Sequence, residues 1–201
     1  MVCKKYYIVF ITLLALLLGS PSLASQGSQV LEVARGYTAV REKTNHNDAP
    51  EIDMFLKYVG LKPHFPYCLA FANFCWGQVV KPLPYPRVGG TIYFMEMVKA
   101  HPLRYKVYAA EDFRRGLGTN MTGGIGIYFH GPKSGHAVLF DKQIDLHTFS
   151  TIEGNTVGVN SKNSAEQRGE GKTSKKQGVY RRVRSNRSSA GMQFKGIVVP
   201  R

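Results

Sequence analysis

The spacing of apolar residues in the first part of the chain predicts two amphipathic helices. Between residues 28 and 43, apolar side chains recur every three or four positions, which is the period of a helix with one buried face. A second helix is predicted over residues 48–60. Asp48 and Pro50 resemble a helix start, and Gly60 is a typical stop. The N-terminal part of the chain is therefore expected to be helical.

A third helix is expected to begin at Cys68 and to be buried. Residues 62–66 contain two prolines, so the chain should arrive extended at Tyr67 and turn into a helix immediately afterwards. Residues 68–76 are apolar on nearly every side, a pattern typical of a helix enclosed by other elements. A further short helix is predicted over residues 92–100.

The second half of the chain carries short runs that favour strands. These runs are rich in β-branched and aromatic residues and are separated by glycine, proline, aspartate and serine. They cover residues 125–129, 136–140, 148–153, 179–183 and 194–199. Helices followed by an antiparallel sheet define an α+β fold. Residues 155–178 are rich in glycine, serine and lysine, and we expect a mobile surface loop there.

The first 24 residues have the layout of a secretory signal peptide. Lys4 and Lys5 precede an apolar run over residues 6–18, and small residues follow up to Ala24, where we expect the cut. The run is about 13 residues long, whereas a membrane-spanning helix needs about 20. Export to the periplasm or to the outside of the cell is therefore predicted.

The composition excludes a disordered chain and indicates that the protein works near a polyanion. The 201 residues are 43% hydrophobic, which is enough for one packed core. The net charge is +14, and removal of residues 1–24, with two lysines and no acid, leaves +12. Residues 156–201 alone carry eleven Lys or Arg against two acids. DNA, RNA, anionic lipids and bacterial envelope polymers would all attract such a surface, so charge does not choose between them.

Two cysteines remain after the expected cut, and their spacing argues against a disulfide. On one helix, Cys68 and Cys75 would have Cα atoms about 10.5 Å apart, whereas a disulfide needs less than about 7 Å. An exported protein that keeps a free thiol commonly uses it in chemistry. Cys68, at the start of a helix, is placed where backbone N–H groups favour a thiolate. Cys75, two turns deeper, is assigned to the core.

His136 is the best candidate for a base that would serve this thiolate. If His136 opens one strand and the chain reverses near residues 144–145, it faces Glu153 across an antiparallel pair, or Asn155 if the register moves by two. A carboxylate or an amide there would orient the imidazole, as a nucleophile and base pair requires. Spacing alone also allows an ordinary surface histidine beside a hairpin, with residues 153–155 forming only a turn.

Several short motifs together resemble the CHAP family of cysteine, histidine-dependent amidohydrolases and peptidases. In chain order they are Tyr67-Cys68-x-x-Phe71-x-x-x-x-Trp76, Gly135-His136-Ala137-Val138, Thr151-Ile152-Glu153-Gly154-Asn155-Thr156, Gly178-Val179-Tyr180-Arg181-Arg182-x-Arg184 and Gly196-Ile197-Val198-Val199-Pro200. The resemblance covers about two thirds of the chain. No single motif is specific, but their order is that of the family.

The resemblance implies a papain-like fold and cleavage of amide bonds in peptidoglycan, by a catalytic domain over residues 63–201 that follows a helical segment over residues 25–62. Carried over by motif, Cys68 would be the nucleophile, His136 the general base and acid, Glu153 the orienting acid and Asn155 a supporting polar group. Neither the bond cut, by an amidase or an endopeptidase, nor the target, the producer's own wall or a rival's, follows from the sequence.

The chain also departs from the family pattern. The family often has a Gly-Asp pair leading into the strand before the histidine, where this chain has residues 124–126, Gly-Ile-Gly. Some members bind calcium through acids near the cysteine. Here Asp48, Glu51 and Asp53 fit a helix start, so no metal and no cofactor are predicted.

The expected partners follow from the proposed chemistry. Peptidoglycan would be the substrate, anionic envelope polymers could hold the basic surface, and an antibacterial effector would have a neutralising immunity protein. We expect no nucleic acid partner and a monomer. The alternative is a non-catalytic module that grips envelope polymers or nucleic acid. The aromatic residues argue against it, because they follow core patterns and do not alternate with Lys and Arg.

Overall fold

The computed structural model describes residues 22–158, 176–189 and 191–201. Nearly all of the expected signal peptide and most of the expected surface loop lie outside these ranges. Within them, no helix is both long and apolar enough to cross a membrane.

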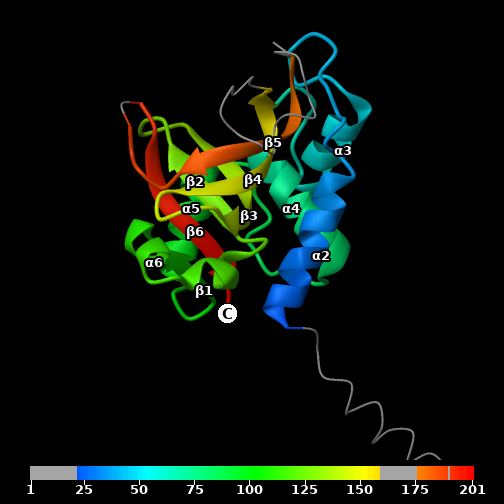
Figure 1. Ribbon diagram of the computed structural model, residues 1–201. Helices are drawn as coiled ribbons and strands as arrows, with labels where there is room; N and C mark the ends of the chain where they lie inside the picture. Colours follow the sequence, from blue (N-terminus) through cyan, green and yellow to red (C-terminus); the bar gives the residue numbers. More distant parts are fainter. Residues whose placement is uncertain (1–21, 159–175, 190) are drawn as a thin grey trace, which may run out of the picture.

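Helices come first along the described chain and an antiparallel sheet follows, which confirms the α+β class (Figure 1). The elements are α2 (Leu23–Arg35), α3 (Pro50–Tyr58), α4 (Cys68–Val79), α5 (Thr91–Ala100), β1 (Tyr105–Tyr108), α6 (Ala110–Arg114), the 3-10 helix η1 (Leu117–Met121), β2 (Ile125–Phe129), β3 (Gly135–Gln143), β4 (Thr148–Val157), β5 (Gln177–Ser185) and β6 (Gln193–Pro200). The predicted start of a helix at Cys68 is confirmed.

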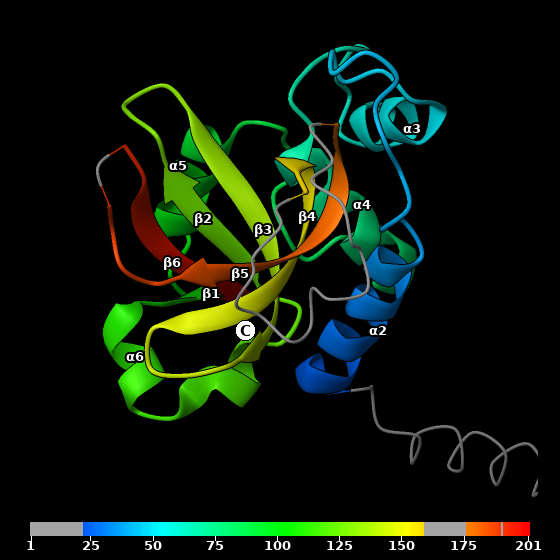
Figure 2. The same cartoon turned by 45° about the horizontal axis from the view of Figure 1, so that its top comes forward.

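The six strands form one sheet in the order β1-β6-β2-β3-β4-β5, and every pairing is antiparallel. The sheet is strongly curved, and α2, α3 and α4 lie together on one side of it (Figure 2). Helix α4 contacts β3 and β4 directly. The start of the buried helix is thereby brought to the strands that carry the predicted base and acid.

Two hydrophobic cores lie on the two faces of this sheet. The larger one joins the sheet to α2, α3, α4 and α5, so residues 25–62 and 63–201 share it. The smaller one is aromatic, with Phe113, Phe140 and Phe149 packed at ring-centroid distances of 5.3 to 6.0 Å. Leu139 belongs to the first core and Phe140 to the second. Strand β3 is therefore apolar at consecutive positions because both of its faces are covered.

The first helix differs from its predicted range of 28–43. It starts at Leu23, where the Ser22 side chain accepts the Ser25 N–H at 3.2 Å, and it ends at Arg35. The chain then extends along β5, where Arg41 pairs with Gly178 and the Val40 carbonyl accepts the N–H of Val179. Pairing with the sheet edge thus replaces the helical turns that the apolar spacing predicted.

Asp48 does not cap the second helix, whose N-cap is Ala49. Its carboxylate instead accepts the Thr44 N–H at 3.0 and 3.1 Å and the Thr44 hydroxyl at 2.8 Å, which closes the loop over residues 44–48. These bonds hold the pKa of Asp48 at about 2. Gly60 has a φ of 77°, in the left-handed region expected after a helix end.

The strands extend further than their apolar runs indicate. Thr156 pairs with Gly178 and Val157 with Gln177, so β4 and β5 continue into the predicted loop at both of its ends. The prediction of a loop is wrong at these positions, because cross-strand hydrogen bonding outweighs the local glycine and serine content. Residues 159–175 of that loop lie outside the described residues. Strand β1 and helix α6 were not predicted.

Candidate active site

Cys68 is the first residue of α4, a helix buried on every side from Cys68 to Gly77. The preceding residue, Tyr67, provides no side-chain cap, so the amides of the first turn remain available to a ligand or to the cysteine itself. Trp76 anchors the helix by donating its indole N–H to the Gly123 carbonyl at 2.8 Å. Cys68 and Cys75 are both free and buried, as predicted for the two cysteines in the described part of the chain.

The imidazole of His136 lies against the sulfur of Cys68. His136 is the second residue of β3 and is 8% exposed, and its side chain hydrogen-bonds the thiol. The backbone N–H groups of Leu69 and Ala137 also donate to the sulfur. Because Nε2 of the imidazole binds a carboxylate, Nδ1 is the ring nitrogen left for Cys68. The contact joins the start of α4 to the start of β3.

This contact changes the pKa of both groups. Burial alone raises the pKa of the Cys68 thiol, but the hydrogen bond and the positive charge of His136 outweigh burial and bring that pKa below its ordinary value of 9.0. Burial lowers the pKa of His136, whereas Cys68 and Glu153 together raise it to about 9. Both shifts favour the pair of thiolate and imidazolium over the neutral pair. Cys75 has no such partner, and burial raises its pKa.

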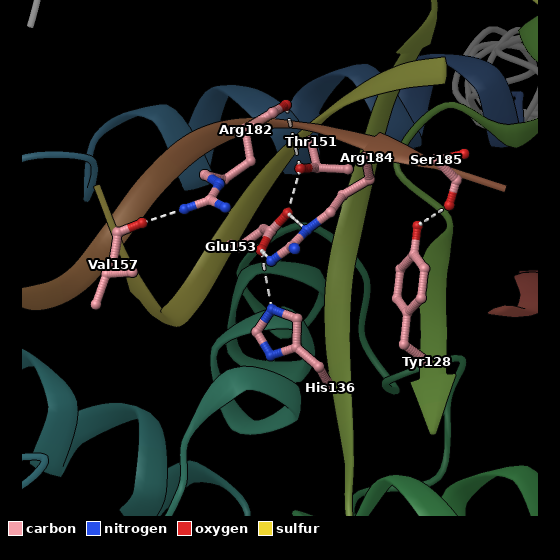
Figure 3. Close-up of polar contacts among 8 residues, drawn as sticks. All are labelled: Tyr128, His136, Thr151, Glu153, Val157, Arg182, Arg184 and Ser185. Carbon is pink, nitrogen blue, oxygen red and sulfur yellow. Dashed lines mark hydrogen bonds and ion pairs between the residues drawn. The ribbon is translucent and has the colours of Figure 1, made fainter. Parts of the chain in front are cut away.

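Glu153 holds the other side of the imidazole. It lies on β4, is fully buried, and accepts the His136 Nε2–H on Oε2 at 2.9 Å. Three further donors complete its shell (Figure 3): Arg184 Nη2 to Oε2 at 2.5 Å, Arg184 Nε to Oε1 at 2.7 Å, and the Thr151 hydroxyl to Oε1 at 2.5 Å. Burial raises the pKa of Glu153, but His136 and Arg184 outweigh it and keep that pKa far below its usual range.

In the register of β3 and β4, His136 does not lie directly opposite Glu153. Leu139 pairs with Ile152, and continuation of this register would bring His136 opposite Asn155, the second of the two predicted arrangements. His136 and Glu153 are then diagonal neighbours on one face, still within reach of each other's side chains. The irregularity falls at Asp141, whose carboxylate accepts bonds from Arg35 and from Ser150.

Asn155 contributes to the site through its backbone. It lies in the left-handed region with φ of 55°, and its N–H donates to the hydroxyl of Tyr67. The Tyr67 hydroxyl in turn donates to the fully buried Glu42 at 3.2 Å. These bonds connect the residue before Cys68 to the strand that carries Glu153. His136 Nε2, the ring nitrogen directed away from Cys68, is hydrogen-bonded to Glu153 and not to Asn155.

Gly154 allows β4 to approach α4 closely. A Cβ atom at this position would lie 3.0 Å from Cβ of Phe71 and 3.0 Å from Cε2 of Tyr67. The absence of a side chain between Glu153 and Asn155 therefore lets the acid-bearing strand pack directly on the first two turns of the helix.

Arg184, Thr151 and the pair of Tyr67 and Glu42 were not predicted as site residues. A signal for Arg184 was present, because alternation along a strand places Tyr180, Arg182 and Arg184 on one face, beside a strand with a single buried acid. For Glu42, at the end of a helical pattern, the sequence held no comparable signal.

The described residues contain no group of three or more His, Cys, Asp or Glu side chains that could hold a metal ion. Asp48, Glu51 and Asp53 do not converge: Asp48 closes its own loop, and the other two lie in the first turn of α3.

Comparisons with protein-family models, with curated proteins and with solved structures found no match for this chain.

Proposed function

We propose that the protein is an exported cysteine hydrolase with a papain-like arrangement, and that it cleaves amide bonds of bacterial peptidoglycan. The observation that carries the proposal is the continuous hydrogen-bonded row from Cys68 through His136 to Glu153, with the thiol pKa lowered. A thiolate, a proton carrier and an orienting acid in contact are what acyl transfer to sulfur requires.

The chemistry follows the positions of the groups. The Cys68 thiolate attacks the carbonyl carbon of the amide, and the electron pair moves to the carbonyl oxygen. The backbone N–H of Cys68, at the first turn of α4, is a donor for this oxyanion. His136 gives its Nδ1 proton to the departing amine, the C–N bond breaks, and a thioester remains on Cys68. His136 then takes a proton from water, which attacks the thioester and releases the acid and the thiolate.

Glu153 and Arg184 serve this cycle without touching the substrate. The carboxylate keeps the proton of His136 on Nε2, so that Nδ1 faces the sulfur, and it stabilises the imidazolium. Arg184 and Thr151 fix the carboxylate from the other side. The imidazole thus has one orientation available for both proton transfers.

Peptidoglycan is proposed as the substrate from three agreeing features: the ordered motifs of the CHAP family, the predicted export signal and the net charge of +12 after its removal. A basic surface raises the local concentration of an enzyme near anionic wall and outer-membrane polymers. Under this proposal the periplasm or the cell exterior is the site of action. A neutralising immunity protein is expected if the target is a rival cell.

The test is digestion of purified peptidoglycan by the wild-type protein and by Cys68→Ala, His136→Ala and Cys75→Ala variants, with mass analysis of the released fragments. We expect wild type and Cys75→Ala to release fragments, and the other two variants to lose nearly all turnover. New amino groups on alanine would mark an amidase, and cuts within or between stem peptides an endopeptidase. Full activity of Cys68→Ala, or binding without cleavage by wild type, would overturn the proposal.

A further inference from the structure

Arg182 is a half-buried cation beside the candidate site, and no carboxylate in the described ranges forms an ion pair with it. It lies on β5, where it pairs with Thr151 of β4, and its side chain shares a face with Glu153. Figure 3 shows Arg182 and Arg184 flanking Glu153, with the His136 ring next to that carboxylate. Arg182 is close enough to Glu153 and Arg184 for their charges to affect its pKa.

The described acid whose charge acts on Arg182 is Glu153, and its hydrogen-bonding capacity is already used. Glu153 accepts four hydrogen bonds, two from Arg184 and one each from His136 and Thr151, and these fill its lone pairs. Among the described residues, Arg182 has no ion pair. Its Nη1 donates to the Val157 carbonyl, and its buried Nε finds no acceptor there.

Counted over the described residues of this cluster, the charges leave an excess of one positive unit. Glu153 balances Arg184, and the thiolate of Cys68 balances the imidazolium of His136. Arg182 is left over. Burial and the charge of Arg184 both lower the pKa of Arg182, so they disfavour its charged form. A bound anion would stabilise that charged form. A guanidinium recognises carboxylates through paired N–H donors.

We propose that Arg182 binds a carboxylate of the substrate, so that the enzyme prefers amides flanked by a free carboxylate over those flanked by a carboxamide. This inference rests on the proposed function for the identity of the substrate, a peptide stem that carries such a group. The binding of a carboxylate at Arg182 does not depend on that identity.

The test of the substrate preference uses peptidoglycan in two forms, untreated and with its carboxylates converted chemically to carboxamides. On untreated material, Arg182→Gln should lower kcat/KM about 10- to 100-fold, the usual effect of losing a charged hydrogen bond, chiefly through KM. The matched control is Arg181→Gln, which removes the same charge from the exposed neighbouring position on β5. It should change kcat/KM less than about twofold.

On amidated peptidoglycan, wild type should fall to the level of Arg182→Gln, and the variant should show no further loss. Arg182→Lys, which keeps the charge, should retain part of the preference and covers the case in which the glutamine variant does not fold. An equal loss for Arg182→Gln on both substrates, or equal effects of Arg181→Gln and Arg182→Gln, would overturn the inference.

A second measurement needs no amide cleavage. Iodoacetate and iodoacetamide alkylate the same thiol but differ in carrying a carboxylate or a carboxamide. Arg182→Gln should lower the ratio of the two alkylation rates at Cys68 several-fold relative to wild type and Arg181→Gln. An unchanged ratio would refute an anion site at Arg182. Failure of wild type to cleave peptidoglycan, with the ratio lowered as expected, would refute the substrate and leave the site standing.

Discussion

Arg184 binds Glu153 through two donors on one edge of its guanidinium: Nε donates to Oε1 at 2.7 Å and Nη2 to Oε2 at 2.5 Å. The carboxylate is completely buried, and a buried acid without compensation would take up a proton. Arg184 keeps it ionised, and the ionised form is the one that can hold an imidazolium. The protonation state of His136 therefore depends on Arg184, which forms no hydrogen bond with His136 or Cys68 among the described residues.

Arg184→Met should destabilise the protein strongly, because it leaves the buried Glu153 charge without its two-bond arginine partner. Breaking a buried ion pair from one side typically costs about 3–5 kcal/mol. Denaturant unfolding monitored by circular dichroism measures this cost. Arg181→Met, at the exposed neighbouring position, should stay within about 0.5 kcal/mol of wild type. Equal stability of the two variants would contradict the role of Arg184.

Glu153→Gln keeps the shape of the side chain but removes its charge. Because the negative charge of Glu153 helps to raise the pKa of His136, the substitution should lower that pKa and narrow the range in which the imidazolium exists. Turnover should fall, but by less than in Cys68→Ala or His136→Ala. The alkaline limit of activity should move to lower pH. A pH profile that keeps its alkaline limit at the wild-type position would show that the charge of Glu153 has no part in holding the proton.

The pH dependence of kcat/KM should be bell-shaped, as expected for a pair that acts as thiolate and imidazolium. Activity should rise as the Cys68 thiol ionises, at a pH below the ordinary thiol value of 9.0, and should fall as His136 loses its proton near pH 9. Alkylation by iodoacetamide should follow the same rising limb, with Cys68 labelled much faster than Cys75 at pH 7. Equal slow labelling of both would favour a non-catalytic binding module.

Tyr67→Phe removes the hydroxyl that accepts the Asn155 N–H and donates to Glu42. Two buried polar groups then lose a partner, which typically costs about 1–3 kcal/mol. We expect a lower melting temperature and slower turnover, because α4 and β4 lose a direct link beside Cys68. Tyr93→Phe is the matched control, since this ring is 56% exposed on α5. Melting temperatures that fall equally in both variants would argue against the link.

Local patterns predicted the elements well where neighbouring residues determine them. The prolines before Tyr67 fix the start of α4 at Cys68, and the range of β2 is that of its apolar run. The end of helix α2 was mispredicted because residues 40–42 pair with β5, about 140 positions away in the sequence. The ends of β4 and β5 were missed because they pair with each other across the predicted loop. Only the folded arrangement supplies such hydrogen bonds.

In the candidate site, too, local patterns were predictable and long-range pairing was not. His136 and Glu153 could be selected from their spacing. Whether His136 lies opposite Glu153 or Asn155 could not be predicted, because the sequence of β3 alone does not reveal the irregularity at Asp141. Three arginines of β5 have the same local sequence character. Their different positions, Arg181 exposed, Arg182 half-buried and Arg184 bound to Glu153, follow from strand direction and twist in the assembled sheet.

The proposed mechanism requires His136 to ionise Cys68, and the ultraviolet absorbance of the thiolate in the folded protein at pH 7 reports this ionisation. Wild type and Cys75→Ala should both show the absorbance of one thiolate, and Cys68→Ala and His136→Ala should both lack it. The absence of this absorbance in wild type, or its persistence in Cys68→Ala, would contradict the account.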